Sequence, residues 1–179
     1  KDIQGTGAAT PIAGQRVLTR GVVTATYPAG GFSGISIQTP GTGGTPKTAG
    51  QASDGLFVYS AAAASSTAIG DCVTVEGTAE EYFSLTQLSG TPVVTKLAAG
   101  ECAPVVATPL ATLPPTDADK EPYEGMLVAP RGTYTITNNY QVNQFGTIGL
   151  TPGTEALQVA TNVVAPGPAA LAYEAENVT

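Results

Sequence analysis

The sequence contains no histidine and no tryptophan among its 179 residues. Without histidine the chain has no Ser-His-Asp triad and no Cys-His dyad, and most types of zinc site are also excluded. No apolar run approaches the roughly 20 residues that a membrane-spanning helix needs. We therefore expect no membrane among the partners of this chain.

Charge is scarce, and most of it is negative. Charged residues make up 12% of the chain, which is about half of the usual share. The 7 Lys and Arg residues are outnumbered by 14 Asp and Glu, so the net charge is −7. Non-specific binding of nucleic acids depends mainly on basic side chains that neutralise phosphates. The composition therefore argues against a tight, salt-sensitive nucleic-acid binder.

Only two cysteines are present, Cys72 and Cys102. An even number of cysteines in a chain with few charges fits a secreted protein with one disulfide, although two free buried thiols in a cytosolic protein are the alternative. A hairpin that turns near Phe83 would bring the two cysteines together. The chain also begins at Lys1 without a methionine, so we expect a mature or excised piece of a longer, secreted protein.

What the sequence does contain is typical of an all-β protein. Hydrophobic residues make up 42%, and the 22 Gly and 14 Pro residues supply many turns. Alternation of apolar and polar residues predicts five strands, with a short helical turn at 61–68 before the fourth. A five-stranded OB-type barrel over residues 1–102 fits this order. The predicted strands cover residues 16–27, 32–39, 55–60, 70–82 and 83–97.

The pattern changes after Cys102. Prolines are frequent from residue 103 to residue 122, which predicts an extended connector. Residues 123–179 then form a second β-rich unit that is an incomplete repeat of the first, unless two Thr- and Gly-rich hairpins are alike by chance. A helix is expected to begin at Pro168. Three pairs of segments carry the repeat: Arg20-Gly21 with Arg131-Gly132, Phe32 with Phe145, and Thr39-Pro40-Gly41 with Thr151-Pro152-Gly153.

The densest group of acidic residues lies at the end of the connector, at Asp117, Asp119, Glu121 and Glu124. A solvated loop explains it, and the alternative of a calcium site lacks the glycine and the final glutamate of an EF-hand loop. A proline-rich connector is also a poor platform for acid–base catalysis. We therefore predict no catalytic residue, no metal and no cofactor in this chain.

Nearly the whole chain resembles a known family. Its segments IQGTGAATPIAGQRVLTRGVVTA from Ile3, SDGLFVYS from Ser53, IGDCVTVEGTAEEY from Ile69, YEGMLV from Tyr123 and FGTIGLTPG from Phe145 resemble, in order, the YhcR-like OB-fold region of ExeM/NucH-type bacterial extracellular endonucleases. The resemblance implies a secreted, metal-dependent endonuclease as the parent protein, with its catalytic domain downstream. That chemistry uses paired histidines, which are absent here. The chain is thus expected to be a non-catalytic accessory or spacer region, with the nuclease domain as its partner.

OB-type barrels bind single strands on the face of their second and third strands, where aromatic rings stack on bases. We expect weak contact with single-stranded DNA there, although any one of these rings is also explained as part of the core. A carbohydrate- or surface-binding module is the alternative, since Tyr, Asn and Gln gather at 137–145. The candidate nucleic-acid-binding residues are Tyr27, Phe32, Gln38, Tyr59, Arg20 and Lys47.

Overall fold

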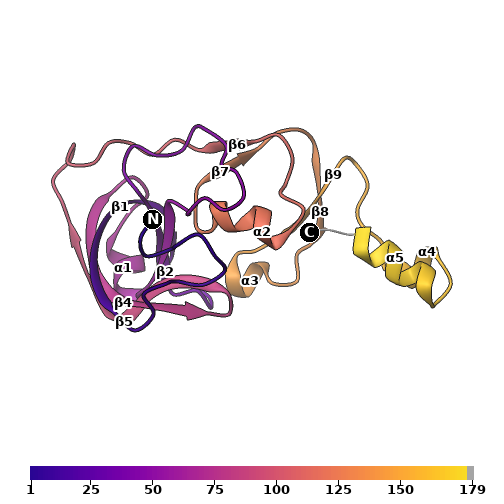
Figure 1. Ribbon diagram of the computed structural model, residues 1–179, viewed down its shortest axis with the longest axis horizontal. Helices are drawn as coiled ribbons and strands as arrows, with labels where there is room; N and C mark the ends of the chain where they lie inside the picture. The colour runs from indigo at the N-terminus through magenta and orange to yellow at the C-terminus, as the bar shows by residue number, and fades with distance from the viewer. Residues whose placement is uncertain (177–179) are drawn as a thin grey trace. The chain divides into compact units, whose positions relative to one another are not determined.

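The structure is a computed structural model that describes the backbone of residues 1–176 and the side chains up to Glu174. It divides after Pro130 into two units, which are described separately below (Figure 1). The first unit is built mainly on strands, as the sequence predicts, whereas the second combines a two-stranded sheet with three short helices among the described residues.

The first unit is a closed five-stranded barrel with the strand order β1-β2-β3-β5-β4. All neighbouring strands are antiparallel except β3 and β5, which are parallel. A short helix separates β3 from β4, which is the order of an OB-type barrel. The fold class predicted from the alternating pattern is therefore confirmed. The elements are β1 (Arg16–Tyr27), β2 (Gly34–Gln38), β3 (Gly55–Tyr59), α1 (Ala61–Ser66), β4 (Cys72–Tyr82) and β5 (Leu85–Lys96).

Side chains alternate between the inside and the outside of the barrel, so every second residue of each strand packs in the core. Helix α1 begins after Ser60, whose side chain accepts a hydrogen bond from the amide of Ala63. Ala63 and Ala64 then pack against the core. The remaining core residues are aliphatic: Val23, Ile35, Ile37, Leu56, Val58, Val73, Val75, Ala79 and Leu88.

Residues 103–130, here called the strap, lie against the barrel. Val106 donates its amide to the carbonyl of Thr42, and Gly41 donates its amide to the carbonyl of Ala103. The first unit consequently extends to Pro130, whereas the sequence pattern placed an extended connector at 103–122. The prolines remove amide donors, but other strap amides bond within the strap, as Thr108 does to the carbonyl of Leu127, or to the barrel, as Leu127 does to the side chain of Gln38. The strap contains β6 (Thr108–Leu110), α2 (Asp117–Lys120), the 3-10 helix η1 (Glu121–Tyr123) and β7 (Val128–Pro130), with β6 and β7 parallel.

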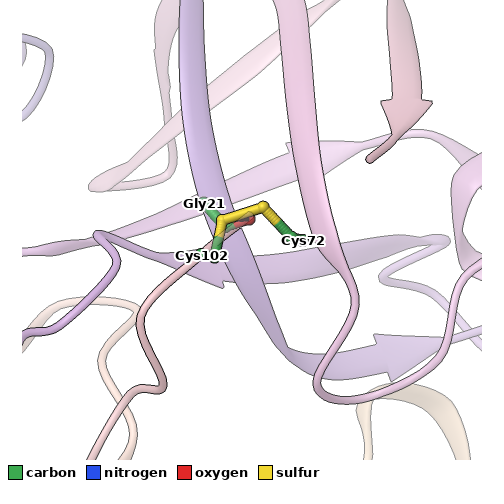
Figure 2. The surroundings of a disulfide bond; sticks show 3 residues. All are labelled: Gly21, Cys72 and Cys102. Carbon is green, nitrogen blue, oxygen red and sulfur yellow. Dashed lines mark hydrogen bonds between the residues drawn. A yellow bond between two sulfur atoms is a disulfide. The ribbon is translucent and has the colours of Figure 1, made fainter. Parts of the chain in front are cut away.

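The predicted disulfide joins Cys72, at the start of β4, to Cys102, just before the strap. The two Cα atoms are 5.6 Å apart. Figure 2 shows the bond beside Gly21 of β1, with the sulfur of Cys102 3.9 Å from the Gly21 carbonyl oxygen. Closing a loop with a sequence separation of 30 residues stabilises the fold by about 3–4 kcal/mol in the chain-entropy model. The bond also fixes the beginning of the strap to the barrel.

The second unit begins at Arg131 rather than at residue 123. Its strands β8 (Tyr134–Asn138) and β9 (Gly149–Pro152) pair antiparallel, as β1 and β2 do in the first unit. This is the part of the chain in which the sequence repeat was recognised. A helix begins at Pro168, as predicted. The elements are β8 (Tyr134–Asn138), α3 (Val142–Phe145), β9 (Gly149–Pro152), α4 (Ala160–Val163) and α5 (Pro168–Glu176).

Candidate nucleic-acid interface

Three aromatic rings gather on the outer face of β1, β2 and β3, and are here called the ring cluster. Phe57 belongs to β3, Tyr27 ends β1, and Phe32 lies in the loop between β1 and β2. The ring centroids are 5.1 Å apart for Tyr27 and Phe32, 5.6 Å for Phe32 and Phe57, and 6.2 Å for Tyr27 and Phe57. These are ordinary distances for tilted aromatic pairs. The structure therefore brings two of the predicted site residues, Tyr27 and Phe32, into contact.

A glycine makes room for the cluster. In the register of the sheet, Gly34 of β2 lies between Tyr27 of β1 and Tyr59 of β3. A Cβ atom on Gly34 would lie 2.5 Å from the Cζ atom of Phe57 and 2.4 Å from the carbonyl oxygen of Val58. Only glycine therefore lets the Phe57 ring lie across β2. Phe57 itself is buried, and sequence reasoning left it out of the site because it could not tell outer-face burial from core burial.

Tyr59 is the most accessible ring beside the cluster. It lies two residues beyond Phe57 on the same face of β3, and 51% of it is exposed. The side chains that continue this face across the sheet are polar. Ser36 lies opposite Phe57 on one side, Gln87 lies opposite Phe57 on the other, and Gln87 donates a hydrogen bond to Glu80. The rings thus lie beside amide and carboxylate groups.

Gln38 is not on a free surface, which corrects the expectation from the sequence. It faces outward on β2, but the strap covers it, and its exposed fraction is 0%. Its Oε1 atom accepts a hydrogen bond from the Leu127 amide at 2.8 Å, and its Nε2 atom donates to Thr42 Oγ1 at 3.2 Å. Gln38 therefore anchors the strap and does not face a ligand.

Lys47 is not available to phosphates either. Its Nζ atom lies 2.7 Å from Asp54 Oδ2, and the side chains of Lys47 and Asp54 are only 11% and 7% exposed. The same ammonium donates to the carbonyl of Ala52. The backbone of Lys47 is held as well, because the Tyr123 hydroxyl accepts from its amide and donates to its carbonyl, both at 2.8 Å. The loop between β2 and β3 is therefore fastened to the strap here.

Arg20 is exposed on the outer face of β1, opposite Thr74 of β4. It lies seven residues before Tyr27 along the same strand, a span of up to about 23 Å. Five of the seven basic residues form ion pairs within the described part of the chain, and Arg20 and Arg131 are the two that do not. The structure therefore does not bring a predicted basic residue to the rings.

A second aromatic pair lies at the turn between β4 and β5. The rings of Tyr82 and Phe83 meet edge to face with centroids 4.7 Å apart, and Phe83 is 90% exposed. Both turn residues, Phe83 and Ser84, have positive φ angles of 47° and 60°, a conformation that favours Gly or Asn. Because β5 runs parallel to β3 with Gln87 opposite Phe57, the turn before β5 lies at the end of the outer face where β3 begins at Gly55. This is the end away from Tyr59.

The acidic residues of the strap separate into two groups. Asp117 and Asp119 lie in the exposed first turn of α2, where the Thr116 side chain caps the helix. Glu121 and Glu124 instead turn toward Glu81 of β4, which sequence reasoning did not connect with them. Burial is the main cause that raises the pKa of Glu121, and burial also raises the pKa of Glu124 to about 7.

No group of three or more Asp, Glu, Cys or His side chains in the described part of the chain is placed to hold a metal ion. Among residues 1–176, no helix is long and apolar enough to cross a membrane. Comparison with protein-family models, with curated proteins and with solved structures finds no match to this chain.

Proposed function

We propose that the chain is a non-catalytic accessory region of a secreted nuclease, and that its barrel makes weak contact with single-stranded nucleic acid. The observation that carries the proposal is the ring cluster with Tyr59 on the outer face of β1–β3, because OB-type barrels bind single strands on this face. The disulfide supports a secreted location, since such bonds persist in oxidising compartments.

Stacking, rather than charge, would supply the affinity. An exposed ring contributes about 1–3 kcal/mol per stacked base, and Tyr59 is the ring best placed to do so. Lys47 is neutralised by Asp54, and Arg20 lies far along β1. Few counterions would be released on binding, so the affinity should depend little on salt.

The test is fluorescence anisotropy of a labelled oligothymidylate with the full, oxidised chain at 20 and 150 mM NaCl. We expect a Kd in the micromolar range or weaker. With a single phosphate neutralised, the Kd should change by no more than about fourfold between these salt concentrations. Tyr59→Ala should weaken binding at least about fivefold. The matched control is Tyr140→Ala, which removes an exposed tyrosine of the second unit and should leave the Kd unchanged.

Two results would count against the proposal: no binding at 20 mM NaCl with protein in the hundreds of micromolar, or an equal loss of affinity in both variants. Plasmid DNA incubated with the chain and magnesium should also remain intact.

A second candidate function is recognition of a neutral carbohydrate. It is favoured by the half-buried carboxylate of Glu80 near the exposed ring of Tyr59, because a carboxylate hydrogen-bonds hydroxyls while a ring packs on the apolar face of a sugar. A titration with neutral β-glucan oligosaccharides, followed by NMR shifts of residues 57–59, tests it. Shifts with the sugar and none with DNA would favour this alternative.

A further inference from the structure

The strap is held to the barrel by a cluster of three carboxylates, Glu81, Glu121 and Glu124, here called the carboxylate cluster. Glu124 Oε1 accepts a hydrogen bond from the Thr86 amide of β5 at 2.7 Å. The Gln4 amide and the Glu121 carboxylate lie near enough to act on the pKa of Glu124. This glutamate of the strap therefore lies beside both the N-terminal segment and β5.

Glu81 completes the cluster from β4. Its Oε2 atom accepts hydrogen bonds from the Thr10 amide at 3.1 Å and from the Thr86 hydroxyl at 2.9 Å. Its Oε1 atom is buried and has no hydrogen-bond partner in the described part of the chain. A further negative charge beside Glu81 would thus be poorly compensated.

No cation faces the cluster among the described residues. Every ion pair of the structure involves another carboxylate, on Asp54, Asp71, Glu76 or Asp117. The charged groups that act on Glu121 and Glu124 from outside the pair are Glu81 and, for Glu121, Asp117. The N-terminal segment and β5 contribute only neutral partners, Gln4, Thr10 and Thr86.

The geometry of the cluster favours a bound proton. Glu124 and Glu81 both accept hydrogen bonds from Thr86, and Glu81 Oε1 is buried without a partner in the described part of the chain, so two negative charges here are poorly compensated. Burial, together with the charges of Glu121 and Glu81, raises the pKa of Glu124 to about 7. Near neutral pH this proton is gained and lost.

The position of the strap gives this titration a structural consequence. Gly55 of β3 lies directly under the strap, because a Cβ atom there would be 2.3 Å from the carbonyl carbon of Gly125. Ser53 donates its hydroxyl to the carbonyl of Glu124 at 2.6 Å, and Gln38 binds the Leu127 amide. The strap therefore covers the end of the outer face that lies away from the ring cluster.

We propose that the strap is a pH-sensitive cover of the outer barrel face, closed while the carboxylate cluster holds a proton and loosened when Glu124 ionises. The Cys72–Cys102 bond keeps the start of the strap attached, so loosening exposes Gln38 and Gly55 without releasing the chain. This inference does not depend on the identity of any ligand.

The test is amide hydrogen exchange by NMR on the full, oxidised chain at pH 5.5 and pH 8.0. The reporters are the Thr86 amide, bound by Glu124, and the Leu127 amide, bound by Gln38. Protection factors correct for the intrinsic pH dependence of exchange. We expect both factors to fall by about tenfold or more between the two pH values, as linkage to one carboxyl group requires. Unchanged protection would overturn the proposal.

Variants separate the cluster from a general effect of alkaline pH. In Glu124→Gln, the amide can still accept from Thr86 and stays neutral at every pH, so the protection factors should stay at their acidic values at pH 8.0. Glu101→Gln, which alters an exposed glutamate, is the matched control. Its protection factors should decrease between pH 5.5 and pH 8.0 as much as those of the wild type. If Glu124→Gln does not fold, Glu121→Gln is tested in its place. It removes the neighbouring negative charge, so the decrease in the protection factors between pH 5.5 and pH 8.0 should become smaller. An undiminished fall in the variant that is tested would refute the proposal.

Discussion

Gln38 offers the sharpest test of how the strap is bound to the barrel. Its side chain has an exposed fraction of 0% and forms hydrogen bonds with the Leu127 amide and with Thr42 Oγ1. Gln38→Met keeps a side chain of similar length and removes both bonds. Thr42 keeps its own bond to the carbonyl of Thr39, so Leu127 is the group left without a partner.

The magnitude follows from these contacts. Each lost hydrogen bond costs about 1 kcal/mol, and a buried amide left unpaired adds about 1 kcal/mol or more. The better burial of the thioether offsets about 1 kcal/mol. The free energy of unfolding should therefore fall by about 2–3 kcal/mol, or by about 5–10 °C in Tm for a chain of this size.

Calorimetry and urea denaturation of the oxidised chain measure this change. Gln51→Met is the matched control, because Gln51 is exposed in the neighbouring loop and accepts only from the Thr48 amide. It should change the stability by less than about 0.5 kcal/mol. If Gln38→Met is as mild as Gln51→Met, Gln38 does not anchor the strap and the argument from its burial fails.

Three other predictions concern the barrel and its attachments. Gly34→Ala should destabilise the fold by about 1–3 kcal/mol, because the new Cβ atom meets Phe57 and Val58. The control Gly7→Ala should be neutral, because its Cβ atom meets nothing within 4 Å. Equal Tm values for the two variants would contradict this. Replacing both Cys72 and Cys102 by serine should lower the free energy of unfolding by about 2–4 kcal/mol in urea denaturation, and a loss below about 1 kcal/mol would show that the bond is not a main constraint. Since burial raises the pKa of Glu124 from 4.5 to about 7, its stabilisation is complete below pH 4.5 and is lost as the pH rises through 7. The loss is about 1–2 kcal/mol after allowance for solvent screening, and urea midpoints of Glu124→Gln should lack this decline.

The arrangement of the outer face changes how the candidate site is understood. The sequence suggested that Arg20 and Lys47 bind nucleic acid together with the rings. In the structure Lys47 is paired with Asp54, and Arg20 lies apart on β1. The rings remain together, but the charged side chain nearest to them across the sheet is that of Glu80. Ligands that stack without carrying phosphate therefore deserve equal weight in binding experiments.

The sequence by itself determined the barrel. Alternation of apolar and polar residues is a local property with a period of two, and it located both ends of each of the five strands to within two residues. The short helix after β3, the disulfide and the helix at Pro168 were likewise marked by nearby residues. The contact between Tyr27 and Phe32 was also foreseeable, because the turn of one hairpin joins them.

The tertiary structure alone decided which outward-facing side chains are free. Gln38 is covered by an amide 89 residues away, and Lys47 is held by a tyrosine 76 residues away. Alternation places a side chain on the outer face, but it does not say whether a distant segment packs over that face. The same reason explains why Glu81 could not be joined to Glu121 and Glu124 from the sequence. Their meeting depends on how a proline-rich segment docks on a closed barrel, which no local pattern encodes.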